Sequence, residues 1–226
     1  MMRLFSIVII LVFITISIYG QSSSKTIKLW NGKDYTGWEL VTNPSVDIKS
    51  ACKIESDSVL AIAGKPIGYL ATINSYENYR LHIEYRWLND AVNNCNSGVL
   101  IHIASRPIDR NTWPLCFQIQ MKIMHAGDLL PMAGAKFAEP LSSAPEAKTP
   151  QLERQKSDSE KPIGQWNIVD IICRNSTIKC MINGIVQNRV TKCKPHAGKI
   201  GFQLEGFPYE LRNIWLMQLD ENVHNK

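Results

Sequence analysis

The feature that most constrains the fold of this 226-residue chain is an alternation of apolar and polar side chains with a period of two residues. In residues 79–87, Leu81, Ile83 and Tyr85 alternate with polar residues, and residues 117–122 and 200–205 repeat the pattern. This period is typical of β-strands with one buried face. Further strand candidates are 98–103, 166–173, 178–182 and 211–219. Turn signals such as Asn183-Gly184 separate them, so the sequence predicts an all-β sandwich or barrel.

Residues 124–165 break this rhythm, because Gly, Pro, Ala, Ser and charges replace the apolar periodicity, most clearly in residues 142–161. A long irregular segment inside a compact domain is usually either functional or disordered. The sequence leaves two interpretations open, a lid over a binding face and a mobile surface excursion.

The N-terminus has the pattern of a secretion signal. Arg3 precedes an apolar run over residues 4–18, and the small residue Gly20 stands at a plausible cleavage position. The run is shorter than the ~20 residues that span a bilayer, although an uncleaved anchor is the alternative. We therefore expect a signal peptide (1–20), a linker (21–27), one folded domain (28–220) and a tail (221–226), in a periplasmic or secreted protein with no membrane attachment after cleavage.

Composition excludes several functions. The net charge of +5 is modest and the basic residues are spread out, so no nucleic-acid partner is expected. No nucleotide-binding glycine motif and no Cys/His metal spacing are present, so neither a cofactor nor a metal is predicted. Cys116, Cys173 and Cys180 lie in predicted strands, where buried thiols are common core residues. Cys173 and Cys180 also flank a turn and could pair across a hairpin.

The polar faces of the predicted strands are rich in long hydrogen-bonding side chains. Such groups on neighbouring strands can bind many hydroxyls at once, and Trp113 and Trp166 could stack on sugar rings, which points to carbohydrate. The alternative is an ordinary exposed face with core tryptophans. The residues on these faces are His82, Glu84, Arg86, Gln118, Gln120, Lys122, Gln203 and Glu205.

A series of short motifs occurs in an order that resembles the 3-keto-disaccharide hydrolase domain family, from about Leu29 to Leu219. Each motif alone is weak, and their shared order is specific. They are Leu29-Trp30-Asn31-Gly32-Lys33-Asp34 with Gly37-Trp38, Gly68-Tyr69-Leu70 with Thr72, Glu84-Tyr85-Arg86, Asn96-Ser97-Gly98-Val99, Trp113-Pro114, Cys116-Phe117-Gln118-Ile119-Gln120, Gly164-Gln165-Trp166-Asn167, Asn183-Gly184, Gly198-Lys199-Ile200-Gly201, and Glu205-Gly206 with Leu211-Arg212-Asn213-Ile214.

The resemblance implies a concanavalin A-like jelly roll, a two-sheet antiparallel β-sandwich with carbohydrate on its concave face. It also implies cleavage of glycosides already oxidised at C3, so a separate sugar oxidoreductase would act first. A C3 ketone acidifies the C2 hydrogen, so a base can remove it and the C1 substituent can leave. From residue type and strand face, the base candidates are Glu84, His102 and Glu205.

The predicted substrate-binding residues, which would hold hydroxyls, the oxyanion or the sugar ring, are Arg86, Asn96, Trp113, Gln118, Gln120, Lys122 and Arg212. Structural roles remain open for several of these positions. Glu84 and Arg86 could form an ion pair on one strand face, His102 could be an interior histidine, and Arg212 could be structural.

One position departs from the family pattern. Gln118 stands where the family usually has Glu, and an amide cannot accept a proton at neutral pH. The sequence therefore leaves open a non-catalytic carbohydrate-binding module of the same fold. A structural interaction domain is a third hypothesis, and it would have exposed apolar patches and no pocket on the concave face.

Overall fold

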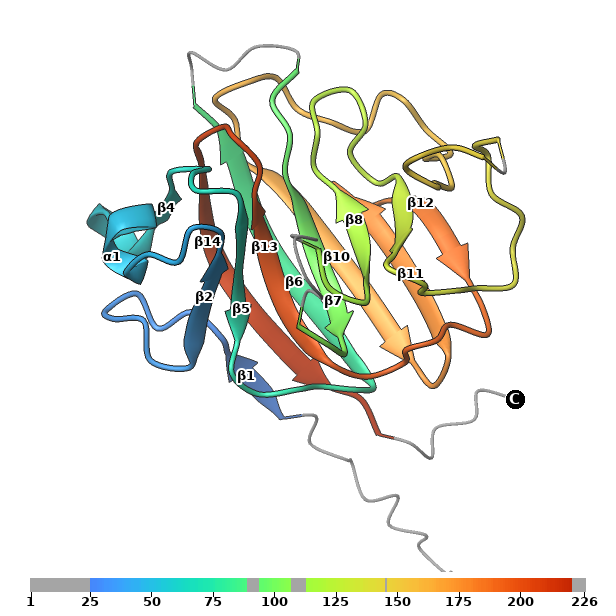
Figure 1. The fold of residues 1–226 in the computed structure, drawn as a ribbon, viewed down its shortest axis with the longest axis horizontal. Coiled ribbons are helices and arrows are strands. Elements are labelled where there is room, and N and C mark those ends of the chain that lie inside the picture. Colours follow the sequence, from blue (N-terminus) through green and yellow to red (C-terminus); the bar gives the residue numbers. More distant parts are fainter. Residues whose placement is uncertain (1–24, 89–93, 107–112, 145, 221–226) are drawn as a thin grey trace, which may run out of the picture.

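The chain folds into two stacked antiparallel β-sheets, which confirms the predicted sandwich (Figure 1). The computed structural model describes residues 25–88, 94–106, 113–144 and 146–220. The predicted signal peptide and C-terminal tail lie outside the described residues. The first strand begins at Thr26, inside the predicted linker. In the described part of the chain, no helix has the length and apolar character needed to cross a membrane.

The larger sheet has eight strands. In spatial order they are β12 (Ile185–Val190), β11 (Thr177–Ile182), β10 (Asn167–Arg174), β6 (Tyr79–Trp87), β14 (Tyr209–Gln218), β4 (Leu60–Ile62) and β3 (Cys52–Ile54), with β1 (Thr26–Lys28) also pairing with β14. One helical turn, α1 (Ile48–Ala51), leads directly into β3, and a 3-10 turn, η1 (Ser56–Ser58), precedes β4. Asp47 begins α1 by accepting a hydrogen bond from the Lys49 amide.

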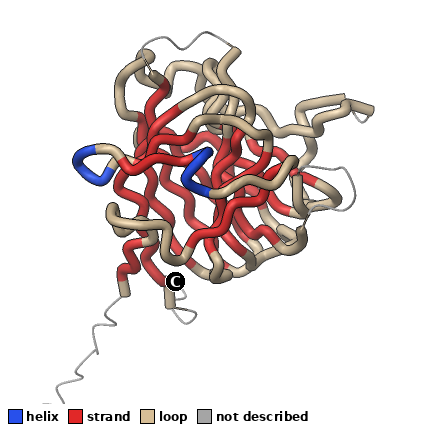
Figure 2. The backbone as a smooth tube through the Cα atoms, turned by 60° about the vertical axis from the view of Figure 1, so that its left-hand side comes forward, coloured by secondary structure: helices blue, strands red, loops and turns tan. Residues whose placement is uncertain are grey.

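The smaller sheet has six strands and carries the site described below. In spatial order they are β2 (Trp38–Thr42), β5 (Gly68–Thr72), β13 (Lys199–Leu204), β7 (Gly98–Ile103), β8 (Cys116–Gln120) and β9 (Leu129–Met132). Figure 2 shows the strands in the body of the molecule, with long loops extending from them.

The core lies between the two sheets because the alternating apolar residues of both face inward. In β6 the odd-numbered residues from Tyr79 to Trp87 are buried, and the even-numbered ones are partly exposed. In β7 and β8, Val99, Ile101 and Phe117 join the same core. Side chains of opposite parity therefore lie on the outer face of each sheet.

A second, smaller apolar cluster covers part of the outer face of the six-stranded sheet. It consists of Tyr69, Ala71, Leu100, Ile103 and Cys116, packed against Val41, Trp113 and Met132. This face is therefore not simply a solvated surface. Apolar residues and Trp113 lie beside the polar residues of β8 and β13, in the same sheet.

Candidate functional site

A cavity of about 560 Å3 opens on the outer face of the six-stranded sheet, within the size range of small-molecule sites. Because β7 runs antiparallel to β8 and β13, the start of β7 and the ends of β8 and β13 meet at one edge. Six of the predicted site residues line this cavity: Asn96, Trp113, Gln118, Gln120, Lys122 and Glu205. It is also lined by Gln203, His125, Asp128 and residues 148–151.

Three glutamines form the floor of the cavity through a chain of hydrogen bonds. Gln203 Nε2 donates to Gln118 Oε1 at 3.1 Å, and Gln118 Nε2 donates to Gln120 Oε1 at 3.0 Å. Gly98 makes room for this chain, because a Cβ there would lie 2.8 Å from Gln118 Nε2 and 2.9 Å from Gln203 Oε1. The amides are thus held in one orientation before any ligand arrives.

Three oxygen atoms of the cavity residues are buried without a hydrogen-bond partner among the described residues. They are Asn96 Oδ1, Gln203 Oε1 and Glu205 Oε2. Buried polar atoms are normally paired, so each unpaired one needs an explanation. All three are hydrogen-bond acceptors, so the described side chains leave these acceptors of the cavity lining unpaired.

Glu205 lies just beyond the end of β13, and its carboxyl group has an altered acidity. Burial raises the pKa of Glu205 above the ordinary value, and the positive charge of Lys122 offsets part of that increase. A carboxyl group with a raised pKa that lines a cavity is suited to take up and release a proton.

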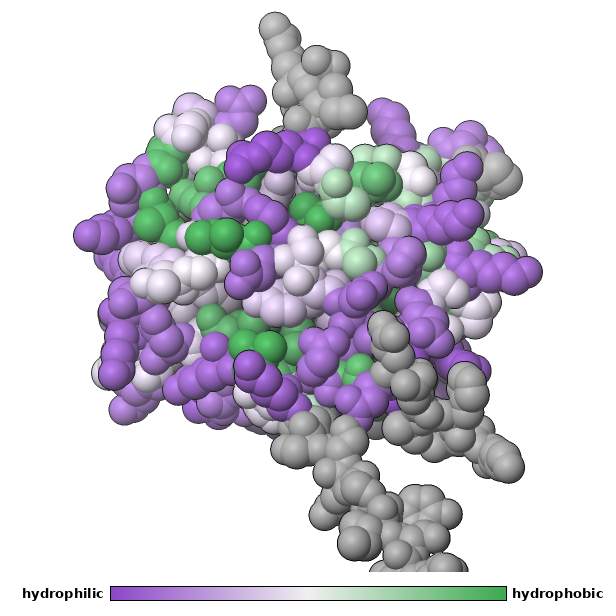
Figure 3. Space-filling view, turned by 90° about the horizontal axis from the view of Figure 1, so that it is seen from below, coloured by the Kyte–Doolittle hydropathy of each residue, from purple (hydrophilic) through white to green (hydrophobic). Residues whose placement is uncertain are grey.

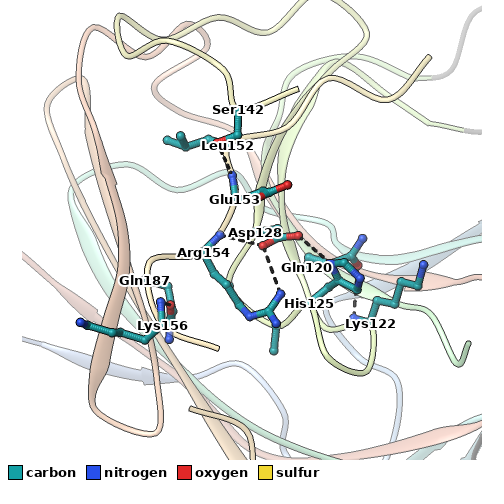
Figure 4. A network of polar contacts seen from close by, with 12 residues as sticks. Gln120, Lys122, His125, Asp128, Ser142, Leu152, Glu153, Arg154, Lys156 and Gln187 are labelled. Atoms are coloured by element: carbon teal, nitrogen blue, oxygen red, sulfur yellow. Dashed lines mark hydrogen bonds and ion pairs between the residues drawn. The ribbon is translucent and has the colours of Figure 1, made fainter. Parts of the chain in front are cut away.

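On another wall of the cavity, His125 contacts a buried carboxylate (Figure 4). Its Nδ1 lies 3.1 Å from Asp128 Oδ2, and the Asp128 side chain is 1% exposed. The other oxygen, Asp128 Oδ1, accepts a hydrogen bond from the Arg154 amide at 2.7 Å. Our sequence analysis did not identify His125 or Asp128. The available signal was a His and an Asp three residues apart in the turn after β8.

The described residues of the 124–165 segment are here called the strap, and several of them form a wall of the cavity. Asn188 Nδ2 donates to the Gly127 carbonyl at 2.9 Å and lies 3.3 Å from the Leu152 and Glu153 carbonyls. Gln187 Oε1 accepts from the Lys156 amide. The strap also contains β9. Its contacts with β12 and the cavity favour the predicted lid over the surface excursion.

The sequence matches the family model of the 3-keto-alpha-glucoside-1,2-lyase-like domain over residues 25–217. The chain belongs to this family. The match confirms the resemblance found in the motifs, and it spans almost the whole described chain. No curated protein matches the sequence significantly.

Solved structures share the fold at low sequence identity. A candidate glycosyl hydrolase from Parabacteroides distasonis superposes with a TM-score of 0.61 at 18% identity, covering 86% of this chain and 94% of that one. The carbohydrate-binding module CBM66 from Bacillus subtilis gives a TM-score of 0.55 at 6% identity, covering 82% and 98%. A β-glucanase from Bacillus licheniformis gives 0.52 at 10% identity, covering 88% and 100%. The chain thus combines a 3-keto-alpha-glucoside-1,2-lyase-like family match with a fold that glycosyl hydrolases and a carbohydrate-binding module share.

Four predicted site residues lie outside the cavity, and three of them are in the other sheet. Glu84, Arg86 and Arg212 are on the outer face of the eight-stranded sheet and do not line the cavity. Arg212 Nε donates to Glu84 at 2.7 Å, and the guanidinium groups of Arg212 and Arg86 lie 4.1 and 4.7 Å from the Trp166 ring. The structure separates them from the cavity residues, since strand alternation identifies a face but not which sheet carries it.

The environment of Glu84 is that of a paired surface carboxylate. Partial burial raises its pKa, but hydrogen bonds from Asn213 and Arg212 outweigh that effect, and the net pKa is lowered. Trp166, predicted as a possible stacking residue, is covered by the two guanidinium groups. Glu84 and Arg86 are therefore both ion-paired on this face, but not with each other: Glu84 pairs with Arg212, and Arg86 pairs with Glu210.

His102, a leading base candidate, points into the core instead of the cavity. Between β7 and β13 the register shifts by one residue, and His102 has φ of 54°. This β-bulge reverses the alternation, so His102 packs against Tyr79 and Phe117. Burial lowers the pKa of His102 to about 4, while Nδ1 hydrogen-bonds the Pro195 carbonyl. A neutral, 1% exposed histidine outside the cavity is not placed to act on substrate.

The cysteines in the predicted strands are core residues. Cys173 and Cys180 carry free thiols, because Cys173 is opposite Ile178 and Cys180 opposite Ile171 in the hairpin register. The predicted cross-hairpin pair is therefore wrong. Burial raises the pKa of both thiols to about 12. Within residues 25–220, leaving aside the undescribed gaps, no three His, Cys, Asp or Glu side chains converge as a metal site.

The cavity and the face shown in Figure 3 do not favour the interaction-domain hypothesis. The face shown in Figure 3 is mostly polar, and its apolar residues form small, separate patches. Among the described residues, the exposed large apolar side chains are Ile67, Ile73, Met124, Leu141, Ile163 and Ile185. Single exposed apolar residues of this kind are common on soluble proteins.

Proposed function

We propose that this protein is an exported enzyme that cleaves 3-keto-glycosides by removing the C2 proton and eliminating the C1 substituent. The observation that carries the proposal is Glu205, a cavity carboxylate with a raised pKa and a buried, unpaired oxygen. The surrounding amides and Trp113 fit a neutral, hydroxyl-rich ligand.

Glu205 is the base in this reaction. The C3 ketone acidifies the C2 hydrogen, so Glu205 can take that proton and leave an enolate whose charge lies on O3. The Lys122 ammonium group lines the same cavity and would stabilise this oxygen. When the C3 carbonyl re-forms, the electrons move to C1–C2 and the C1–O bond breaks. Water can add to the product afterwards.

The protein would act outside the cytoplasm, downstream of another enzyme. Arg3, the apolar run over residues 4–18 and Gly20 support export to the periplasm or medium. The sequence has no glycine-rich nucleotide motif. A separate oxidoreductase would therefore make the 3-keto-glycoside.

The test is release of a chromogenic alcohol from a 3-keto-glucoside, run beside the unoxidised glucoside. We expect release from the keto substrate alone, and a fall of roughly 10²–10⁴-fold in the Glu205→Gln variant. Glu84→Gln is the matched control, because it changes a carboxylate on the other sheet, and it should retain activity. Equal activity of Glu205→Gln and the natural chain would contradict the assignment.

One observation favours a second function, a non-catalytic carbohydrate-binding module. Gln118 occupies the centre of the cavity floor, where an acidic residue would add a second proton acceptor. Gln118→Glu separates the two proposals. Activity in the natural chain shows that Gln118 is compatible with catalysis, whereas activity gained only with Gln118→Glu would identify a protein retained for binding.

A further inference from the structure

The pair formed by His125 and Asp128 has no role in the reaction as described so far. The His125 side chain is 44% exposed and lines the cavity, whereas Asp128 is buried beneath it. A carboxylate can only accept hydrogen bonds, so His125 Nδ1 is the donor in their 3.1 Å contact. Nε2 is then the ring nitrogen available to a ligand.

Asp128 is held firmly in its position. One of its oxygens accepts from the Arg154 amide at 2.7 Å, and Arg154 Nη1 lies 3.8 Å from the same atom. The other oxygen contacts His125. With both oxygens engaged and the side chain 1% exposed, Asp128 cannot reach a ligand itself. It can fix the orientation of the imidazole, in the way that a buried carboxylate orients a catalytic histidine.

The elimination needs an acid as well as a base, because a sugar or alkyl alcohol leaves C1 as a strongly basic alkoxide. Glu205 holds the C2 proton once the step is complete, so a different group must donate a proton to the leaving oxygen. Among the described residues that line the cavity, His125 is the one histidine, and histidine is the side chain best suited to give a proton near neutral pH.

We propose that His125 is the general acid of this reaction and that Asp128 is its positioning residue. This assignment rests on the proposed function. In the step, the C2–H proton goes to Glu205 and the C1–O bond breaks. The leaving oxygen takes the proton from Nε2 of protonated His125. The products are an alcohol and a 1,2-unsaturated 3-keto sugar, and proton exchange with solvent restores both residues.

The assignment also defines the substrate class. An enzyme with a dedicated acid acts on glycosides whose leaving group is an unactivated alcohol, such as a second sugar. A nitrophenol leaves as a stable anion and needs no proton. Removal of His125 therefore has an effect that depends on the leaving group, which loss of the base or of the fold would not produce.

The experiment compares methyl and 4-nitrophenyl 3-keto-glucosides as substrates of the full chain. For His125→Gln we expect kcat/KM on the methyl substrate to fall roughly 10²–10⁴-fold, and that on the nitrophenyl substrate to change by less than about fivefold. Asp128→Asn should show the same selectivity with a smaller loss. His196→Gln, at an exposed histidine outside the cavity, is the matched control and should behave as the natural chain.

Equal losses on both substrates in His125→Gln, or no loss on either, would overturn the general-acid assignment while the proposed elimination stood. Cleavage of neither substrate by the natural chain would overturn the proposed function and this assignment with it. Thermal unfolding of each variant shows whether it is folded. If Asp128→Asn does not fold, His125→Gln alone decides the question. The His125 side chain is partly exposed, so its replacement should leave the protein folded.

Discussion

His102 makes the stability of this protein sensitive to acid in a way that can be calculated. The buried imidazole has a pKa of about 4, against 6.5 for the unfolded residue. Between these values the unfolded chain binds a proton that the folded chain does not, so stability rises with pH. The contribution of neutral His102 to the free energy of unfolding is complete above pH 6.5 and is lost as the pH falls to 4. A difference of about 2.5 pKa units corresponds to roughly 3 kcal/mol.

The assay is urea unfolding at pH 7 and pH 4 of the natural chain and of His102→Asn. Asparagine is suitable because it tolerates the positive φ of this position. The variant will be less stable at pH 7, but the test compares only the change in stability between the two pH values. We expect the natural chain to lose roughly 3 kcal/mol more than the variant between the two pH values.

A control and a contrary result complete this test. His196→Asn, at an exposed histidine, should keep most of the pH dependence of the natural chain, because burial is the main cause of the lowered pKa of His102 and the charge of His196 is the smallest. The same pH dependence in His102→Asn and the natural chain would refute the reasoning, because it would mean that folding does not lower the pKa of His102.

Three further predictions concern the cavity. In Gly98→Ala, the new Cβ displaces the glutamine side chains on the floor, so substrate binding measured by calorimetry should weaken roughly fivefold to tenfold. In Lys122→Met, loss of the positive charge raises the pKa of Glu205 further, so the acid limb of the kcat/KM profile should move to higher pH, since the base must be ionised. In Asn188→Ala, the carbonyls of the strap lose their donor, so urea unfolding should show a loss of roughly 1–3 kcal/mol and proteolysis should cut the strap faster.

The strands that could be predicted are those long enough to show an alternation. Residues 79–87 and 98–103 were predicted with the bounds that β6 and β7 have. Strands of three or four residues, such as β1 and β9, show too few alternations to stand out from a loop. The bulge at His102 was not predictable either, because one inserted residue reverses the face without altering the pattern of residue types.

The cavity floor could be predicted because its glutamines lie on the polar faces of alternating strands. Gln118 and Gln120 are on β8, and Gln203 is on β13, with β7 between the two strands. Glu84 also lies on the polar face of an alternating strand, β6, but that strand belongs to the eight-stranded sheet. Only the strand order shows that Glu84 and the glutamines are in different sheets. His125 and Asp128 lie in a turn, where no periodicity exists. Their contact depends on the packing of the strap, which residue spacing does not encode.

The proposed elimination depends most directly on the removal of the C2 proton by Glu205. The decisive measurement is the kinetic isotope effect on kcat/KM for a 3-keto-glucoside carrying deuterium at C2, with product release followed in the natural chain. We predict slower release of the alcohol from the deuterated substrate, and turnover of both substrates that is roughly 10²–10⁴-fold lower in Glu205→Gln. Equal rates for the two substrates, with Glu205→Gln as active as the natural chain, would contradict the account.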